Sequence, residues 1–452
     1  MLTNQTPTQP ERSSARHGLR FSLAAAIVMT AISVLAIGIL CYWIPYRLQV
    51  LAGTYHAGLI PWCRGWHIAV PHSLSPSAFT TYLAYALNSA WIFYAALLGL
   101  AYCVRTSAPP WILWSGAIIC LTIAFVFPPS LSGDSYTYIG YGRAQAVHHL
   151  NPYITPLGRL VDLHDGFLAE LINQPHGEKA VTWASDATVY GPVWTLLSTL
   201  IAAVTAHAPA MYGVLGIKLV AAVSLFASAV AASRIAERLS LGTGLLSFAA
   251  VALNPLALME GPGQGHNDLL TMALMLWALL ACIDRKPAAA GLYIGLATAV
   301  KLFPVALLPW IIWKLREPGK PWLRDAGLVV ACCAAPLAIG YACFWAGSDM
   351  FTSLHTFVGG RVQHSPLPTL LMYAAASVWV LRSKDRGVIL SAWPLVALPL
   401  ALWNPLKPFP WYLLWAIQPA SSRWNRLHVV YVGLMCLMVY MWQSLWYAVL
   451  VH

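Results

Sequence analysis

Long apolar runs recur along almost the whole chain and restrict its fold more than any other feature. Of the 452 residues, 59% are hydrophobic and only 9% are charged, whereas a soluble domain carries about 25% charged residues. Roughly 20 mostly apolar residues suffice for one transmembrane helix. The sequence therefore predicts an all-α polytopic membrane protein with about 11–13 transmembrane helices. We expect spans at residues 21–43, 80–104, 110–128, 211–233, 241–258, 267–283, 288–315, 325–347, 366–382, 387–403, 408–420 and 427–449.

Two apolar runs are not simple spans. Residues 191–206 form a short run that begins with Gly-Pro, so we expect a juxtamembrane or re-entrant helix, which is permitted where protein covers it. The run 288–315 contains Lys301-Leu302-Phe303-Pro304. Since Pro removes a backbone donor and ends or kinks a helix, this run is predicted to form a hairpin-like pair of half-helices.

The basic residues set the expected orientation. The net charge is +11, but Lys and Arg cluster in short connections, as membrane orientation requires, and no nucleic-acid partner is expected. The basic connections should face the cytoplasm, which leaves the polar loops 44–79 and 129–190 outside. The expected organisation is a cytoplasmic tail (1–20), N-terminal transmembrane helices (21–128), an outer loop with short juxtamembrane helices (129–210) and a transmembrane bundle (211–452).

Asp134 is a carboxylate just beyond the apolar run 110–128, near the expected membrane boundary. Carboxylates are costly at membrane depth, so this one is a candidate functional group. A carboxylate can take the proton of a hydroxyl that attacks C1 of a sugar. One base is enough when the leaving group is a phosphate, whereas glycoside hydrolysis usually needs two carboxylates. The alternative, equally open at this point, is that Asp134 caps the helix that follows.

Several neighbours in the outer loop could contact a substrate. Arg143 could hold a phosphate through bidentate hydrogen bonds, or its side chain could extend along the membrane interface. Tyr136 and Tyr138 could stack on a sugar, or could be ordinary interfacial aromatic residues.

A second polar group interrupts the hairpin at 263–268, Gly-Gln-Gly-His-Asn-Asp. Asp268 could cap the next helix, and His266 could accept a proton, bind phosphate or form a simple hydrogen bond. Capping alone does not explain why His266, Asn267 and Asp268 stand together. Lys301 lies inside an apolar run and needs a partner, which could be a lipid phosphate, Glu260 or Asp268.

Weaker candidates complete an expected cationic rim on the outer side: Arg361, His364 and Lys407. The chain has no Walker A sequence and no GxGxxG opening a helix after a strand. It also has no His/Cys metal signature, so no cofactor is predicted. Asp134 and Asp268 together give only a weak indication of a divalent cation.

Four ordered motifs resemble one enzyme family. Gly133-Asp134-Ser-Tyr-Thr-Tyr138, Gly142-Arg143, Asn151-Pro152-Tyr153 and Tyr190-Gly191-Pro192 resemble the first large loop of C-type (GT-C) glycosyltransferases. The closer resemblance is to the polyprenol-phosphate-mannose-dependent α-1,6-mannosyltransferases of actinobacterial envelopes. Asn254-Pro255-Leu256 with Gly265-His266-Asn267-Asp268, Val300 to Pro304, and Pro410-Trp411-Tyr412 match this family in the same order.

The resemblance implies a GT-C-like bundle in a bacterial inner membrane, with its active site on the periplasmic face. It implies a polyprenyl-phosphate sugar donor and a glycan or glycolipid acceptor. Asp134 falls on the family's catalytic Asp. The positions expected to shape the substrate pocket are Tyr138, Asn151, Tyr153, Tyr190, Asn267 and Tyr412. One departure is that Asp134 follows the third expected span, whereas the family's carboxylate usually follows the first.

Two other functions are compatible with parts of the sequence. A transporter or flippase of a lipid-linked or anionic solute would account for Lys301 and the broken helix. It also predicts paired polar interruptions in two related halves, which the sequence does not contain. A binding or scaffold subunit would leave Asp134 dispensable. The enzyme interpretation requires Asp134, His266 and Lys301 to face one cavity.

Overall fold

The computed structural model describes residues 88–451 except 100, 103–109, 127–128, 130–131, 169–183, 318, 320, 362–366, 403–408 and 425. Within these ranges every regular element is a helix, and the one β feature is an isolated bridge between Ala346 and Ser348. The expected tail at 1–20 and the expected span at 21–43 lie outside the described residues.

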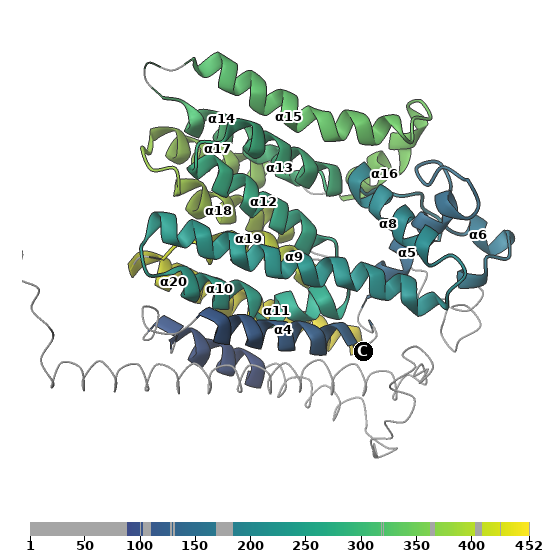
Figure 1. Cartoon of the computed structure of the whole chain (residues 1–452), viewed down its shortest axis with the longest axis horizontal. Coiled ribbons are helices and arrows are strands. Elements are labelled where there is room, and N and C mark those ends of the chain that lie inside the picture. The colour runs from purple at the N-terminus through teal and green to yellow at the C-terminus, as the bar shows by residue number, and fades with distance from the viewer. Residues whose placement is uncertain are drawn as a thin grey trace, which may run out of the picture.

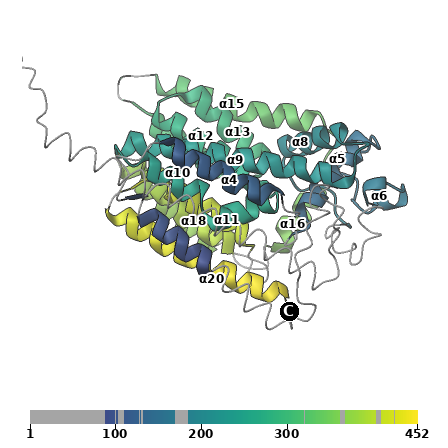
Figure 2. The ribbon, with the colours of Figure 1, turned by 60° about the horizontal axis from the view of Figure 1, so that its bottom comes forward.

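The helices pack side by side in a bundle whose axes run along the longest dimension of the molecule (Figure 1). The bundle helices are α4 (Pro110–Val126), α9 (Ala210–Leu239), α10 (Gly244–Ala252), α12 (Asp268–Ile283), α13 (Pro287–Val300), α14 (Leu308–Leu315), α15 (Trp322–Ala342), α17 (Leu367–Arg382), α18 (Val388–Leu402), α19 (Leu414–Ala420) and α20 (Arg426–Val451). The helical residues 88–99 pack against α20, where the hydroxyl of Tyr440 donates to Oδ1 of Asn88 (Figure 2).

Shorter helices gather at one end of this bundle or break its spans. They are α5 (Asp134–Ala146), α6 (Arg159–Asp162), α8 (Pro192–Val204), α11 (Pro255–Leu258), the π-helix η4 (Met259–Gly263), η5 (Phe303–Leu307), η6 (Asp349–Phe351), α16 (Thr352–Arg361) and η7 (Pro410–Leu413). Figure 1 shows α5, α6 and α8 together at one end of the bundle, where α5 and α8 pack against α9.

Two described helices are long and apolar enough to cross a membrane, Met211–Leu239 and Trp322–Ala342. A third span exists if α10 and the α11–η4 segment, which are bent by 50° at their junction, count as one. The other apolar helices are shorter, with 10–17 residues. This architecture is consistent with a polytopic membrane bundle, and the expected total of about 11–13 spans stays a prediction.

The run 288–315 forms a helical hairpin, which confirms the predicted break. α13 ends at Val300, Lys301 has an extended backbone (φ −151°, ψ 136°), and η5 begins at Phe303 with Pro304 in its first turn. Lys301 contacts the first residue of α12, whereas Ile311 in α14 lies beside Cys282 near the end of α12. The chain therefore reverses direction between α13 and α14.

The run 191–206 forms α8, which has 13 residues and packs along α5. The amide of Gly191 donates to the carbonyl of Val300 (3.1 Å), so α8 begins beside the end of α13. At the other end of α8, Nη1 of Arg143 donates to the carbonyl of Ala206 (3.2 Å). Gly142 permits the close packing, since a Cβ there would overlap the backbone of Ser198. The run therefore forms a single short helix, and its juxtamembrane position stays a prediction.

The end of the bundle opposite α5 carries the basic connections. Arg238 pairs with Asp284 (3.0 Å), Arg386 with Glu317 (3.7 Å) and Arg423 with Asp385 (2.5 Å). Arg285 also pairs with Glu317. The described basic connections therefore meet at one end, as the orientation argument requires.

Candidate functional site

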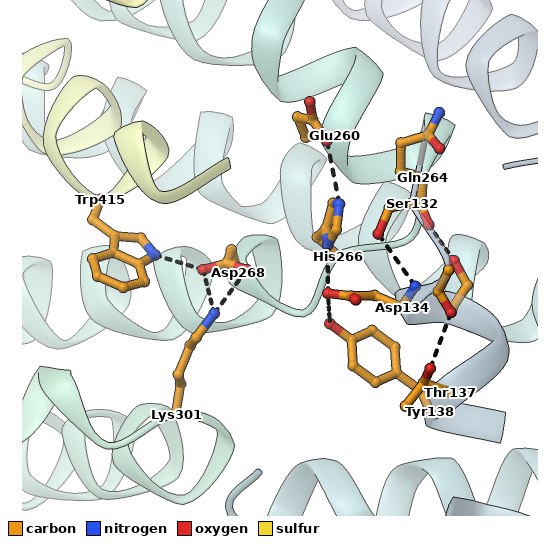
Figure 3. A network of polar contacts seen from close by, with 12 residues as sticks. Ser132, Asp134, Thr137, Tyr138, Glu260, Gln264, His266, Asp268, Lys301 and Trp415 are labelled. Atoms are coloured by element: carbon orange, nitrogen blue, oxygen red, sulfur yellow. Dashed lines mark hydrogen bonds and ion pairs between the residues drawn. The ribbon is translucent and has the colours of Figure 1, made fainter. Parts of the chain in front are cut away.

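Four separate segments bring polar side chains together at the α5 end of the bundle (Figure 3). Asp134 begins α5, and the connection from η4 to α12 supplies Glu260, His266 and Asp268. Lys301 follows α13 directly. The residues Trp411, Tyr412 and Trp415 come from η7 and α19.

Asp134 is accessible while it contacts protein groups. Its side chain is 15% exposed. The hydroxyl of Tyr138, one turn further along α5, donates to Oδ2 of Asp134 (3.4 Å). The N-cap of α5 is Gly133, and the first amide of the helix, that of Asp134, donates to the hydroxyl of Ser132 (3.2 Å). Capping therefore does not explain Asp134, although its charge in the first turn suits the helix dipole.

His266 lies between two carboxylates. Its Nδ1 is 3.4 Å from Oδ2 of Asp134, and its Nε2 is 3.2 Å from Oε2 of Glu260. Both distances are within ion-pair range. Neither ring nitrogen is aligned for a hydrogen bond. The ring stacks on Trp411 with centroids 3.8 Å apart.

The charge of His266 follows from these neighbours. His266 lies in the connection after η4, outside the candidate spans, and is fully buried. Burial alone would lower its pKa, but the carboxylates of Asp134 and Glu260 outweigh burial and raise the pKa to about 9. At neutral pH the ring is therefore an imidazolium held between two carboxylates.

The backbone around η4 explains how His266 reaches Asp134. The side chain of Asn254 accepts from the amide of Ala257 (3.2 Å) and starts α11, and Pro262 lies inside η4. Gly265 has a φ of +82°, which favours glycine. Beside it, the hydroxyl of Ser135 donates to the carbonyl of Gln264 and ties this connection to α5.

Lys301 pairs with Asp268. Its Nζ donates to both carboxylate oxygens, at 2.8 and 3.0 Å, and Nε1 of Trp415 donates to Oδ1 of the same group (2.5 Å). The ammonium also lies 4.6 Å from the ring centroid of Tyr412. Asp268 is fully buried, whereas the Lys301 side chain is 18% exposed. Of the two protein partners considered for Lys301, Glu260 and Asp268, the structure shows Asp268.

Asn267 lies between His266 and Asp268 in the sequence and is 1% exposed. Within the described residues, neither its amide nitrogen nor its amide oxygen has a hydrogen-bond partner. Buried polar groups are nearly always hydrogen-bonded, so this amide is an exception. On α5, Tyr138 packs edge-on against Tyr190, with ring centroids 4.9 Å apart.

Four predicted substrate contacts lie elsewhere and hold the outer segments together. Arg143 pairs with Asp165 (3.0 Å), Asn151 donates to the carbonyl of Phe344 (2.7 Å), and the hydroxyls of Tyr153 and Tyr136 donate to the carbonyls of Tyr190 (2.9 Å) and Pro129 (3.3 Å). Direct substrate binding by these four side chains stays a prediction.

The Arg143 guanidinium has a partner within the protein, the carboxylate of Asp165. Burial favours a raised pKa for Asp165, but Arg143 and His148 outweigh burial and lower it. Asp165 is fully buried, so this ion pair stabilises the outer segments.

The expected cationic rim is not described in full. Arg361 is the last residue of α16, and its side chain lies outside the described part of the structure. His364 and Lys407 also lie outside the described residues. Their role stays a prediction.

Sequence reasoning missed Glu260, Trp411 and Trp415 as site residues. Glu260 is an ionisable group directly after an apolar stretch, and this signal could have identified it. Among the residues that the structure describes, no group of three or more His, Cys, Asp or Glu side chains could hold a metal. Metal dependence stays open to experiment.

Comparison with known proteins gives a consistent family assignment. The family profile described as alpha-(1->6)-mannopyranosyltransferase, N-terminal domain, matches residues 19–317. The chain is 25% identical to alpha-(1->6)-mannopyranosyltransferase A of Mycobacterium tuberculosis over 248 residues, which cover 52% of this chain and 45% of that protein. It is 23% identical to the protein of the same name from Corynebacterium glutamicum over 203 residues, 43% of this chain and 37% of that protein.

These matches span less than half the length of either relative. No solved structure matches the chain significantly. The residues from Asp134 to Lys301 lie inside the region that the family profile covers, whereas Trp411, Tyr412 and Trp415 lie beyond it.

Proposed function

The chain belongs to the alpha-(1->6)-mannopyranosyltransferase family, and from this premise we propose that it is a membrane glycosyltransferase that transfers mannose. The donor is a polyprenyl-phosphate mannose, and the acceptor is an envelope glycan or glycolipid. The protein lies in a bacterial inner membrane as a polytopic bundle, with its site on the periplasmic face. The gathering of the basic connections at the opposite end of the bundle supports this orientation.

Asp134 is the general base of the proposed reaction. As the acceptor oxygen attacks C1 of mannose, its proton moves to the Asp134 carboxylate. The bond from C1 to the phosphate oxygen breaks, polyprenyl phosphate leaves with the bonding electrons, and the configuration at C1 inverts. The 15% exposure of the Asp134 side chain supports access by an acceptor hydroxyl.

His266 positions Asp134. Both of its ring nitrogens face carboxylates, so the ring is not free to bind a phosphate. Glu260 keeps the ring protonated, and the stacked Trp411 fixes its plane. The imidazolium thereby holds the Asp134 carboxylate in one orientation and stabilises its charged form.

Lys301 stabilises the departing phosphate. An ammonium has three donors, and Asp268 accepts from Lys301 through two oxygens while the side chain stays partly exposed. A cation fixed before the reaction stabilises the charge that develops on the leaving group. Asn267, Tyr138 and Tyr190 bind the sugar, with the unpartnered amide of Asn267 supplying both a donor and an acceptor.

One observation carries this proposal: the accessible carboxylate of Asp134 faces His266. His266 lies two residues before Asp268, which pairs with the partly exposed Lys301. This cluster lies at one end of the bundle. A transporter site is expected near mid-depth, at the interface of related halves, so the position of the cluster favours the enzyme over the transporter.

The test is transfer of radiolabelled mannose from polyprenyl-phosphate mannose to an endogenous acceptor in membranes that contain the protein. Asp134→Asn should abolish transfer while the protein still folds and inserts. The matched control is Asp162→Asn, because the Asp162 side chain is 66% exposed and lies in the outer segment. Near-normal turnover in the Asp134→Asn variant would refute the assignment.

A further inference from the structure

A cavity of about 340 Å³ opens at the end of the bundle opposite Asp134. It lies between the last turns of α9 and α12 and the first turns of α13. Three basic residues and one carboxylate line it, together with two aromatic rings: Arg234, Arg238, Lys286, Asp284, Trp277 and Tyr293. None of these residues belongs to the site described above.

The cavity has more positive charge than its own carboxylate can neutralise. Arg238 pairs with Asp284 (3.0 Å). Arg234 lies one turn before Arg238 on the same helix face, where like charges destabilise each other. Within the described residues, neither Arg234 nor Lys286 makes an ion pair. An anion bound between Arg234 and Lys286 would reduce the repulsion among the basic side chains that line the cavity.

The guanidinium of Arg234 is already oriented by protein contacts. It lies over the ring of Trp277, 5.3 Å from the centroid. Trp277 in turn packs against Tyr293, with centroids 6.2 Å apart. A stacked guanidinium keeps its fork of donors free for bidentate contact with a phosphate, so the cation is pre-organised.

Apolar side chains also line the cavity. Leu280, Ala281 and Ala289 line it together with the two aromatic rings. Leu292 on α13 is 44% exposed beside Tyr293, as expected for a surface that contacts lipid. Trp and Tyr side chains favour the level of the lipid headgroups. The ligand should therefore carry both an anionic head and an apolar body.

We propose that this cavity binds the phosphate headgroup of an anionic phospholipid from the cytoplasmic leaflet. Arg234 and Lys286 bind the phosphate, the Arg238–Asp284 pair forms a fixed wall, and Trp277 and Tyr293 contact the glycerol and the first methylenes. The inference rests on the proposed membrane orientation and not on the transfer reaction. It is therefore tested by lipid binding without any activity assay.

The purified full chain is placed in nanodiscs of phosphatidylcholine that contain increasing fractions of phosphatidylglycerol. The lipids that stay bound to the protein are counted by native mass spectrometry. Wild-type protein should retain phosphatidylglycerol in preference to phosphatidylcholine. The Arg234→Gln, Lys286→Gln double variant should weaken retention about 25-fold, because each basic residue near an anionic surface contributes roughly fivefold. The matched control is Arg324→Gln, an exposed Arg in the first turn of α15 at the same end of the bundle.

Three outcomes would overturn the proposal. The double variant could retain phosphatidylglycerol as the wild type does, or Arg324→Gln could lose it equally, which would indicate a diffuse charge effect. In a separate arm, inorganic phosphate is added to the protein in nanodiscs that contain phosphatidylglycerol. Arg234-dependent binding of inorganic phosphate that displaces phosphatidylglycerol would show that the site takes a free phosphate. Thermal unfolding of each variant in phosphatidylcholine checks that the protein remains folded.

Discussion

Lys301 donates to both carboxylate oxygens of Asp268 and so ties the end of α13 to the start of α12. The carboxylate is fully buried, whereas the lysine side chain retains 18% exposure toward the site. Removing one partner of a buried ion pair leaves an uncompensated charge, which destabilises more than the pair itself stabilises. Lys301 therefore has a structural role in addition to its proposed contact with the phosphate.

The two roles of Lys301 are separable with a double variant. Lys301→Met should destabilise the protein by about 3–5 kcal/mol, because Asp268 is left buried and unpaired. Adding Asp268→Asn should restore most of this stability, since Nε1 of Trp415 can still donate to the amide oxygen. Transfer should stay impaired in the double variant. Thermal unfolding and the KM for the donor measure the two effects, and recovery of normal transfer would exclude Lys301 from phosphate binding.

The Glu260–His266–Asp134 contacts predict a specific pH dependence. The pKa of His266 is raised to about 9 in the folded protein, above its ordinary value of about 6.5. Stability from the charged ring is therefore complete below pH 6.5 and is lost as the pH rises through 9. Glu260→Gln removes one of the two carboxylates that raise this pKa. Stability and transfer in that variant should decline at a lower pH than in the wild type.

The pH profile of kcat/KM between neutral pH and the alkaline limit measures this shift. The control is Asp162→Asn, which removes an exposed carboxylate far from the ring and should leave the alkaline limit unchanged. The same alkaline limit in Glu260→Gln and wild type would show that Glu260 does not act through His266.

The sequence predicted the grouping of Asp134, His266 and Lys301 because polar residues are rare in an apolar chain. When most helices are apolar, the few ionisable side chains must meet at helix ends, where they can pair or contact water. The break at Pro304 was predictable for a local reason, the missing amide of proline. The family resemblance supplied the expectation for Asp134 that spacing alone left open.

Other contacts depend on tertiary packing that no local pattern reveals. The π-helix η4 turns Glu260 toward His266, and a regular helix would aim it elsewhere. Arg143 pairs with Asp165, which follows it by 22 residues in the sequence. The loop between them carries no distinctive motif. The phosphate-binding prediction for Arg143 therefore did not include this protein partner.

Arg143 should matter for stability more than for chemistry. Arg143→Gln leaves the buried Asp165 with His148 as its remaining charged partner, so we expect destabilisation of roughly 3 kcal/mol. Arg159→Gln is the matched control, because the Arg159–Asp162 pair is 63% and 66% exposed and should contribute less than about 1 kcal/mol. Chemical unfolding of both variants checks the difference. A folded Arg143→Gln variant with wild-type stability and a raised donor KM would support the phosphate role instead.

Asn267 should show the opposite balance between stability and function. Its buried amide has no partner among the described residues, and an unpaired buried polar group destabilises by about 1–3 kcal/mol. Asn267→Leu, which keeps a similar shape, should therefore leave the ligand-free protein equally stable or more stable, while the KM for the donor rises.

Asn151→Leu is the matched control for Asn267→Leu. The Asn151 amide donates to the carbonyl of Phe344 (2.7 Å) and accepts from the amide of Tyr153 (3.0 Å). Loss of these two hydrogen bonds should destabilise the protein. Parallel thermal unfolding and donor titration decide the point. Because only a ligand-binding amide is expected to lower affinity without lowering stability, destabilisation of Asn267→Leu to the level of Asn151→Leu would contradict a role for Asn267 in sugar binding.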